Sequence, residues 1–394
     1  MDLEAAMPQI TAAPSDAARR PAPPAPIPLA HGGVLDALRF LAAFCMVIYH
    51  FSFSSPTPLA EIHPLFARGY LATDFFLIVS GYVLGRIYGE RVAGADIGAA
   101  TFFARRAQRL VPANLIMIGA FIALVLLCAL VGIAPQHPEY LSWRDLPAEL
   151  FLVQAFGVPG GVGWNGPTWT LSALLGCYLI FPPLWRAQAR IRSAAVVTLI
   201  AFGFLFLADA LSTTLMHIRI YEFYSAVGII RAVPLFLVGA ALARVSETVF
   251  IPPAVAKIVT VLSAAALVAV QFAGRHDFVS VALIAALVTG AGAVPVKRPS
   301  HILKTAALVS FAIFITNEFV RFLYVGVLHA VTHGRSLSPA AGWAAWWAAI
   351  AAAMIFAVIF HYAVDMPTQR WIKRVRRDGL RASIAPPRTA QAAG

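Results

Sequence analysis

The chain has 394 residues, of which 60% are hydrophobic and only 12% are charged, with a mean hydropathy of +0.78. Charged residues make up about a quarter of an ordinary soluble domain, so this composition excludes a soluble globular enzyme. The net charge of +12 does not indicate a partner nucleic acid, because the basic residues are spread between apolar runs of membrane-spanning length. We therefore predict an integral membrane protein.

The first 33 residues form a Pro/Ala-rich tail without the apolar periodicity of a packed element, and we predict that it is disordered. No short apolar region with a cleavage site precedes Val34, so no cleavable signal peptide is expected. The rest is predicted to form a transmembrane domain over residues 34–370, followed by a basic cytoplasmic tail over 371–394.

Apolar windows predict an all-α polytopic fold of about ten transmembrane helices. An even number of spans places both termini on one side, and most of the 30 Lys and Arg residues fall on that side. The positive-inside rule therefore predicts cytoplasmic termini, with the longest external loop over residues 134–166. The predicted spans are 35–52, 69–88, 111–133, 167–185, 193–211, 226–244, 254–273, 277–295, 305–330 and 339–363.

The first span carries two ionisable residues, Arg39 and His50, which are costly in a membrane and hence functional candidates. Their spacing of three helical turns places them on nearly the same face, about 16 Å apart along the axis. Near the outer end, a neutral His50 imidazole could accept a proton from a hydroxyl. Near the inner end, the Arg39 guanidinium could bind an anionic donor substrate. The alternative is an arginine that snorkels to the headgroups beside Asp36 and an interfacial histidine.

In the second span, Asp74 opens the segment DFFLIVSGYVLG, where Ser80 and Gly81 allow another helix to approach closely. The next segment, FFARRAQRLVP over residues 102–112, places Arg105, Arg106 and Arg109 within one turn of each other. Guanidinium groups bind phosphate oxygens bidentately, so this cluster suits a nucleotide-bearing donor such as coenzyme A. The alternative is a topogenic or lipid-binding basic loop.

Two later regions complete the set of candidate positions. In the outer loop, Trp143 and Trp164 could stack on sugar rings or simply lie at the membrane interface. In the ninth span, Glu318 and Arg321 are one turn apart and are expected to neutralise one another. The histidines and cysteines show no metal-ligand spacing, so no metal is predicted.

Taken in order, these segments resemble the acyltransferase-3 family of multispanning membrane O-acyltransferases, over most of residues 34–375. LDALRFLAAFCMVIYHF is similar to the family's opening helix, with its Arg-His pair on Arg39 and His50. TDFFLIVSGYVLG resembles its second helix, and FFARRAQRLVP carries its Arg-x-x-Arg on Arg106 and Arg109. PTWTLSALLGCYLIFP resembles its Trp-Ser-Leu-Ser helix, and HYAVDMPTQRW resembles its closing segment, with Asp365 in place of a glutamate.

Two positions depart from the family pattern. Leu174 stands where the family usually has a glutamate, and Asn317 stands where it has a histidine. Each replaces a titratable group.

The resemblance implies transfer of an acyl group, commonly acetyl, from cytoplasmic acyl-CoA to a hydroxyl of an envelope glycan, lipid-linked sugar or other acceptor. It implies a bacterial-type inner membrane, contacts with membrane lipids, and no bound cofactor. His50 would be the base or an acyl relay, Arg39 would orient it or stabilise the thioester oxyanion, and Arg105, Arg106 and Arg109 would hold the donor phosphates. Supporting roles are expected for Asp74, Ser80, Gly81, Trp169, Ser172, Glu318 and Asp365.

Alternatives to this reading remain open from the sequence. Ten spans with buried charges also suit a transporter or flippase for an anionic lipid or sugar precursor, although no inverted repeat is evident. A catalytically degenerate family member is a further alternative, because of Leu174 and Asn317. Transfer could be direct or could pass to a separate periplasmic transferase, as in some members of the family.

Overall fold

The computed structural model describes residues 27–132, 138–158 and 163–384. In these ranges the chain is helical and contains no strand, which confirms the all-α polytopic fold predicted from the sequence. The main helices are α1 (Val34–Ser52), α2 (Leu59–Ile62), α3 (Leu71–Ala93), α4 (Ala99–Leu130), α5 (Leu146–Leu150), α6 (Trp169–Ala189), α7 (Ala194–Met216), α8 (Gly228–Thr248), α9 (Pro253–Ala273), α10 (Asp277–Ala293), α11 (His301–Thr332), α12 (Pro339–Phe360) and α13 (Met366–Ile384).

Short helical turns join several of these helices. They are η1 (Pro64–Arg68), η2 (Pro138–Tyr140), η3 (Gly166–Thr168), η4 (Ile220–Glu222), η5 (Ser225–Val227) and the π-helical turn η6 (His361–Asp365).

Among the described residues, nine helical segments are long and apolar enough to cross a membrane, and α10, with 17 residues, is a shorter apolar helix. All ten predicted spans thus correspond to apolar helices. The peripheral helix α9 has only 17% of its apolar window buried, so most of its apolar surface faces outward. An outward apolar surface is what contact with lipid requires.

The tightest helix contact joins α3 and α8 through glycines. A Cβ atom on Gly81 would overlap the backbone oxygen of Phe236, and one on Gly239 would overlap that of Ile78. Only glycine permits such close backbone approach. The sequence predicted a close helix contact at Ser80 and Gly81. Gly81 is buried in this contact, whereas Ser80 beside it is half-buried.

The Arg105–Arg109 segment is not the loop expected between the second and third spans, because α4 begins at Ala99 and runs through it. Pro112 lies inside the helix and has no N–H, so the carbonyl of Gln108, four residues earlier, loses its helical donor. Gln369 of α13 donates to that carbonyl at 3.1 Å. The proline is therefore accommodated by a hydrogen bond from another helix.

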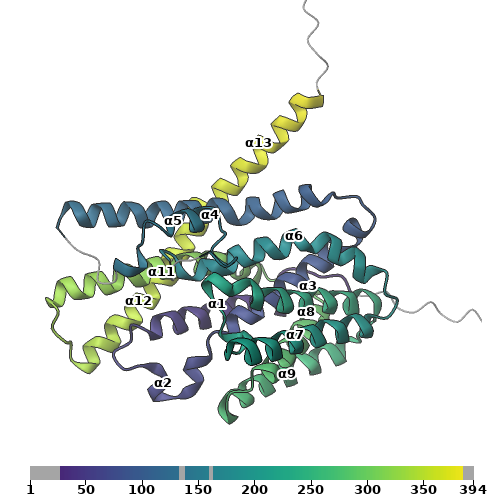
Figure 1. The fold of residues 1–394 in the computed structure, drawn as a ribbon, viewed down its shortest axis with the longest axis horizontal. Helices are drawn as coiled ribbons and strands as arrows, with labels where there is room; N and C mark the ends of the chain where they lie inside the picture. Colours follow the sequence, from purple (N-terminus) through teal and green to yellow (C-terminus); the bar gives the residue numbers. More distant parts are fainter. Residues whose placement is uncertain (1–26, 133–137, 159–162, 385–394) are drawn as a thin grey trace, which may run out of the picture.

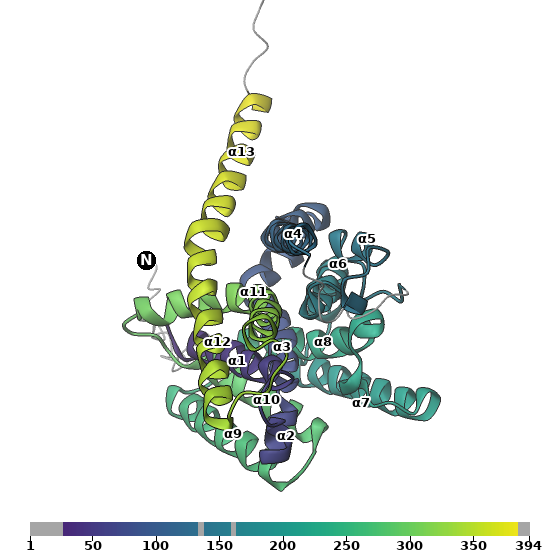
Figure 2. The same cartoon turned by 90° about the vertical axis from the view of Figure 1, so that its left-hand side faces the viewer.

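The chain ends differ in how they meet the bundle. Residues 1–26 of the predicted disordered tail lie outside the described residues, but the following residues contact the bundle. Arg86 donates to the carbonyl of Ile27 at 2.5 Å, and the Ser300 N–H donates to the carbonyl of Gly32 at 3.1 Å. At the other end, α13 continues from α12 and extends away from the bundle in both views (Figures 1 and 2). The predicted basic tail therefore begins within α13.

Candidate functional site

Helix α1 carries both ends of the candidate site and packs mainly against α11. Its buried face includes Ala43, Met46 and Val47, at the helical spacing that an amphipathic face requires. Arg39 lies towards the start of α1 and His50 lies in its last turn, so the "Arg39 end" and the "His50 end" below denote the two ends of this helix.

At the Arg39 end, the guanidinium turns towards the start of the helix. Arg39 Nη1 lies 3.3 Å from Asp36 Oδ1. Asp36 is itself buried and accepts a hydrogen bond from the Gly32 N–H at 2.6 Å. Asp36 thus holds the Arg39 side chain pointing away from His50.

At the His50 end, the imidazole meets α11. His50 Nδ1 lies 2.7 Å from Asn317 Oδ1. In the next turn Glu318 and Arg321 form an ion pair, as the sequence predicted, and Arg321 also donates to Ser54 Oγ at 3.1 Å. The hydrogen-bond partner of His50 is thus an uncharged amide, and the two charged residues beside it pair with each other.

The side chains of Arg106 and Arg109, both on α4, contact different neighbours. Arg106 donates to the Tyr88 hydroxyl at 2.7 Å and lies 4.8 Å from the centre of that ring. Arg109 donates to Asp365 Oδ1 at 2.5 Å and lies 4.3 Å from the centre of the Phe311 ring. These contacts hold both guanidinium groups in fixed positions.

These arginines and Arg39 lie near one tyrosine of α6, Tyr178. Tyr178 lies within electrostatic range of Arg39, Arg106 and Arg109, and Arg39 also lies within range of Arg109. The structure therefore brings together arginines that are about 70 residues apart in the sequence. The sequence did not indicate Tyr178 or Tyr88 as members of this group.

The cluster carries excess positive charge. Asp36 pairs with Arg39, and Asp365 pairs with Arg109. In the ranges that the structure describes, no salt bridge joins Arg105 or Arg106 to a carboxylate, and the Nε atoms of both are buried without a hydrogen-bond partner. A site with unpaired guanidinium donors of this kind favours an anion with several oxygens, such as a phosphate.

Asp365 is positioned by the π-helical turn η6, which ends at Asp365, two residues before Pro367. A π-turn adds a residue to the helix and often occurs at functional sites. Here it places Asp365 against Arg109 and also 3.4 Å from His361 Nδ1. Asp365, for which a supporting role was predicted, thus lies next to the arginine cluster.

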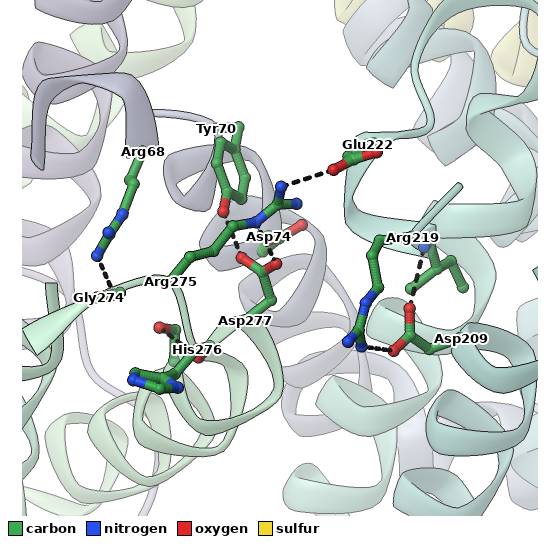
Figure 3. A network of polar contacts seen from close by, with 12 residues as sticks. Arg68, Tyr70, Asp74, Asp209, Arg219, Glu222, Gly274, Arg275, His276 and Asp277 are labelled. Atoms are coloured by element: carbon green, nitrogen blue, oxygen red, sulfur yellow. Dashed lines mark hydrogen bonds and ion pairs between the residues drawn. The ribbon is translucent and has the colours of Figure 1, made fainter. Parts of the chain in front are cut away.

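Asp74 lies in a different network, near the His50 end of the bundle. It is 0% exposed, and its Oδ1 accepts from Arg231 Nε at 2.8 Å and lies 2.7 Å from Nη2. Figure 3 shows the neighbouring contacts, in which Tyr70 donates to Asp277, and Arg275 pairs with both Asp277 and Glu222. These contacts tie α3, η4, α8 and α10 together.

Glu149 of α5, in the loop between α4 and α6, bonds the residues that precede η3. Its carboxylate, 2% exposed, accepts from the Trp164 N–H at 2.6 Å and the Asn165 N–H at 3.1 Å. Burial raises the pKa of Glu149 to about 7, although both backbone N–H groups lower it. Asn165 Nδ2 then donates to the carbonyl of Ile315 at 3.0 Å, so the loop reaches α11 two residues before Asn317.

The remaining supporting candidates stabilise the entry to α6. Ser172 Oγ accepts from the Ala155 N–H at 3.1 Å, which fixes the preceding loop. Trp169 packs over Gly228 and lies 6.0 Å from the Arg231 guanidinium. Trp143 is 53% exposed and stands edge-on to Trp164, with 4.8 Å between ring centres.

Comparison with known proteins points to one family. The model of the acyltransferase-3 family, described as an acyltransferase domain, matches residues 33–362. No solved structure matches the chain.

Three curated relatives match parts of the chain. The protein named "Putative peptidoglycan O-acetyltransferase YrhL" of Bacillus subtilis (strain 168) is 27% identical over 42% of the chain and 26% of its own length. "Acyltransferase MdmB" of Streptomyces mycarofaciens is 29% identical over 40% of the chain and 39% of its own length. "Protein 2 in picA locus" of Rhizobium radiobacter is 28% identical over 45% of the chain and 94% of its own length. The chain thus spans well under half of the first two relatives.

Proposed function

Because the chain belongs to the acyltransferase-3 family and is an integral membrane acyltransferase, we propose that it transfers an acyl group, most simply acetyl, from acyl-CoA to a hydroxyl. The observation that supports this proposal is the placement of an arginine cluster and a histidine at opposite ends of α1. The cluster suits the phosphates of the donor, and the histidine suits proton transfer from the acceptor.

The reach of coenzyme A fits this arrangement. An extended pantetheine arm of about twelve bonds advances about 15 Å, at about 1.25 Å per bond. Arg39 and His50 are separated by about 16 Å along α1. A donor whose phosphates lie at Arg39, Arg106 and Arg109 would therefore present its thioester near His50.

This geometry favours donor binding for Arg39 over a role at the thioester oxyanion. Arg39 is three turns from His50, and its guanidinium turns further away to contact Asp36. An oxyanion donor must lie about 3 Å from the oxygen that develops charge, which is near His50 in this scheme. We assign Arg39, with Arg106 and Arg109, to the phosphates.

The chemical step then needs one base. His50 accepts the proton of the acceptor hydroxyl, and the hydroxyl oxygen forms a bond to the thioester carbonyl carbon. The carbon–sulfur bond breaks, and the proton passes from His50 to the coenzyme A thiolate. His50 returns to its neutral form, and no cofactor takes part in this scheme.

The proposed topology follows from charge. The Arg39 end holds the basic cluster, and most basic loops share its side, so we place that end and both termini in the cytoplasm of a bacterial-type inner membrane. The His50 end and the outer loop then face the envelope. For the acceptor we propose a glycan or lipid-linked sugar, which is supported by a relative named as a peptidoglycan O-acetyltransferase and by exposed Trp143.

Transfer of labelled acetyl from acetyl-CoA in inside-out membrane vesicles tests the proposal. Arg106→Gln should raise the KM for acetyl-CoA about tenfold, since one charge-assisted contact contributes about 1.5 kcal/mol or more. His50→Ala should lower kcat by about 10²- to 10⁴-fold. Arg192→Gln is the matched control, because Arg192 is an exposed basic residue outside the cluster, and it should change neither constant. Full kcat in His50→Ala would refute the assignment.

A further inference from the structure

The bond between His50 and Asn317 joins α1 to α11. Asn317 is 1% exposed and lies within α11, and its Oδ1 is 2.7 Å from His50 Nδ1. Imidazole nitrogens can donate or accept, depending on the tautomer, so the distance alone does not say which atom carries the proton.

The other half of the Asn317 amide decides the direction of this bond. Asn317 Nδ2 donates to the carbonyl of Ile313 at 3.0 Å and to that of Phe314 at 2.7 Å. Backbone carbonyls only accept hydrogen bonds, so the amide nitrogen must face them. The amide oxygen therefore faces His50 and can only accept, which makes His50 Nδ1 the donor.

A neutral imidazole with its proton on Nδ1 has its lone pair on Nε2. The charged groups that face His50 are Glu318 and Arg321, which pair with each other, and its neighbour Tyr49 contacts it through the ring, at 5.9 Å between centres. Neither member of the ion pair is left free to replace the amide as the partner of Nδ1.

We propose that Asn317 is a positioning residue that fixes the tautomer and ring orientation of His50, so that Nε2 is the atom that takes the proton of the acceptor hydroxyl. The role of Nε2 rests on the proposed function, whereas the tautomer does not. The acceptor hydroxyl must then approach His50 from the side opposite Asn317. The proposed role parallels that of the group that orients the histidine in hydrolytic triads, where a wrong tautomer lowers kcat by about 10⁴-fold.

The first test reads the tautomer directly. Nitrogen-15 NMR of histidine-labelled protein in lipid bilayers distinguishes a protonated from an unprotonated ring nitrogen, and the difference from the His50→Gln spectrum identifies the His50 signals. Wild type should show protonated Nδ1 and unprotonated Nε2, and Asn317→Leu should lose this fixed pattern. A wild-type His50 with its proton on Nε2 would overturn the proposal, whatever the activity.

The second test reads the consequence for transfer. Asn317→Leu should lower kcat by about 10²-fold or more, with the KM for acetyl-CoA within about twofold of wild type. Asn317→Asp keeps an acceptor for Nδ1–H, so it should recover at least about tenfold of that loss. Its carboxylate also stabilises the imidazolium form, so the acid limb of its pH–rate profile should move to higher pH.

Thr316→Val is the matched control for folding in the same turn. Thr316 is buried and bonds only the Ala312 carbonyl of its own helix among the described contacts, so kcat should stay within about twofold of wild type. An Asn317→Leu enzyme with unchanged kcat, while His50→Ala is inactive, would overturn the positioning role. Full activity of His50→Ala would instead refute the proposed function, and the NMR result would still decide the tautomer.

Discussion

The Asp74–Arg231 ion pair provides a quantitative test of what holds the bundle together. Both residues are buried, at 0% and 3% exposure, and they meet at 2.7 Å and 2.8 Å. Arg231 also donates to the carbonyls of Tyr70 at 3.0 Å and Phe223 at 3.4 Å. The pair therefore links α3 to α8 and to the segment before α8.

Removing one partner should leave the other charge buried without its counter-ion. We expect Arg231→Met and Asp74→Leu each to destabilise the protein by about 3–5 kcal/mol. The double variant replaces the pair with apolar side chains and should cost much less than the sum, because a buried pair and its apolar substitute are often similar in free energy. The coupling free energy should thus be at least about 3 kcal/mol.

The assay is unfolding of the purified protein in mixed micelles, with the free energy of unfolding measured for wild type, both single variants and the double variant. The fraction that remains folded should keep kcat, since the pair touches neither His50 nor the arginine cluster in the contacts described above. Single variants that each cost less than about 1 kcal/mol, or costs that simply add in the double variant, would refute the reasoning.

Three further predictions follow from particular contacts. Gly239→Ala should lower the melting temperature, because the overlap at the α3–α8 contact costs about 1–3 kcal/mol, whereas Gly203→Ala, with open space around it, should not. Because burial raises the pKa of Glu149 to about 7, its contribution to stability should be largest below about pH 4.5 and should be lost as the pH rises through 7. Glu149→Gln should make the melting temperature less dependent on pH over that range. Gln369→Leu should cost about 1 kcal/mol by leaving a carbonyl unpaired, but should cost almost nothing in a Pro112→Ala background, where the helix supplies its own N–H. An unchanged Gln369→Leu penalty in that background would contradict the account of the proline.

The sequence predicted the helical spans well, because apolar runs of membrane length leave few alternatives. It also predicted the Glu318–Arg321 pair, since residues three apart on a helix are neighbours. It placed residues 89–110 between two spans, because Arg105, Arg106 and Arg109 interrupt the apolar window, whereas α4 runs through them. The donor that accommodates Pro112, Gln369, is distant in the chain.

The site was harder to predict wherever it depends on contacts between helices. The sequence marked Asn317 only as a departure from a family pattern, whereas the structure places it against His50, 267 residues away. Tyr178 carries no motif of its own, and its position near the arginines depends on how α6 packs against α4. Asp74 was predicted in a supporting role, and its ion pair with Arg231, 157 residues away, depends on how α3 packs against α8.

The measurement that tests the central claim most directly is mass spectrometry of the cell-surface glycan and lipid fraction from a strain that lacks the protein. The strain would be complemented with wild type, His50→Ala or Arg106→Ala/Arg109→Ala. We predict that wild type alone restores a fixed acyl mass increment, on an acceptor that the same spectrum identifies. Identical spectra in all strains, or full restoration by His50→Ala, would contradict the account.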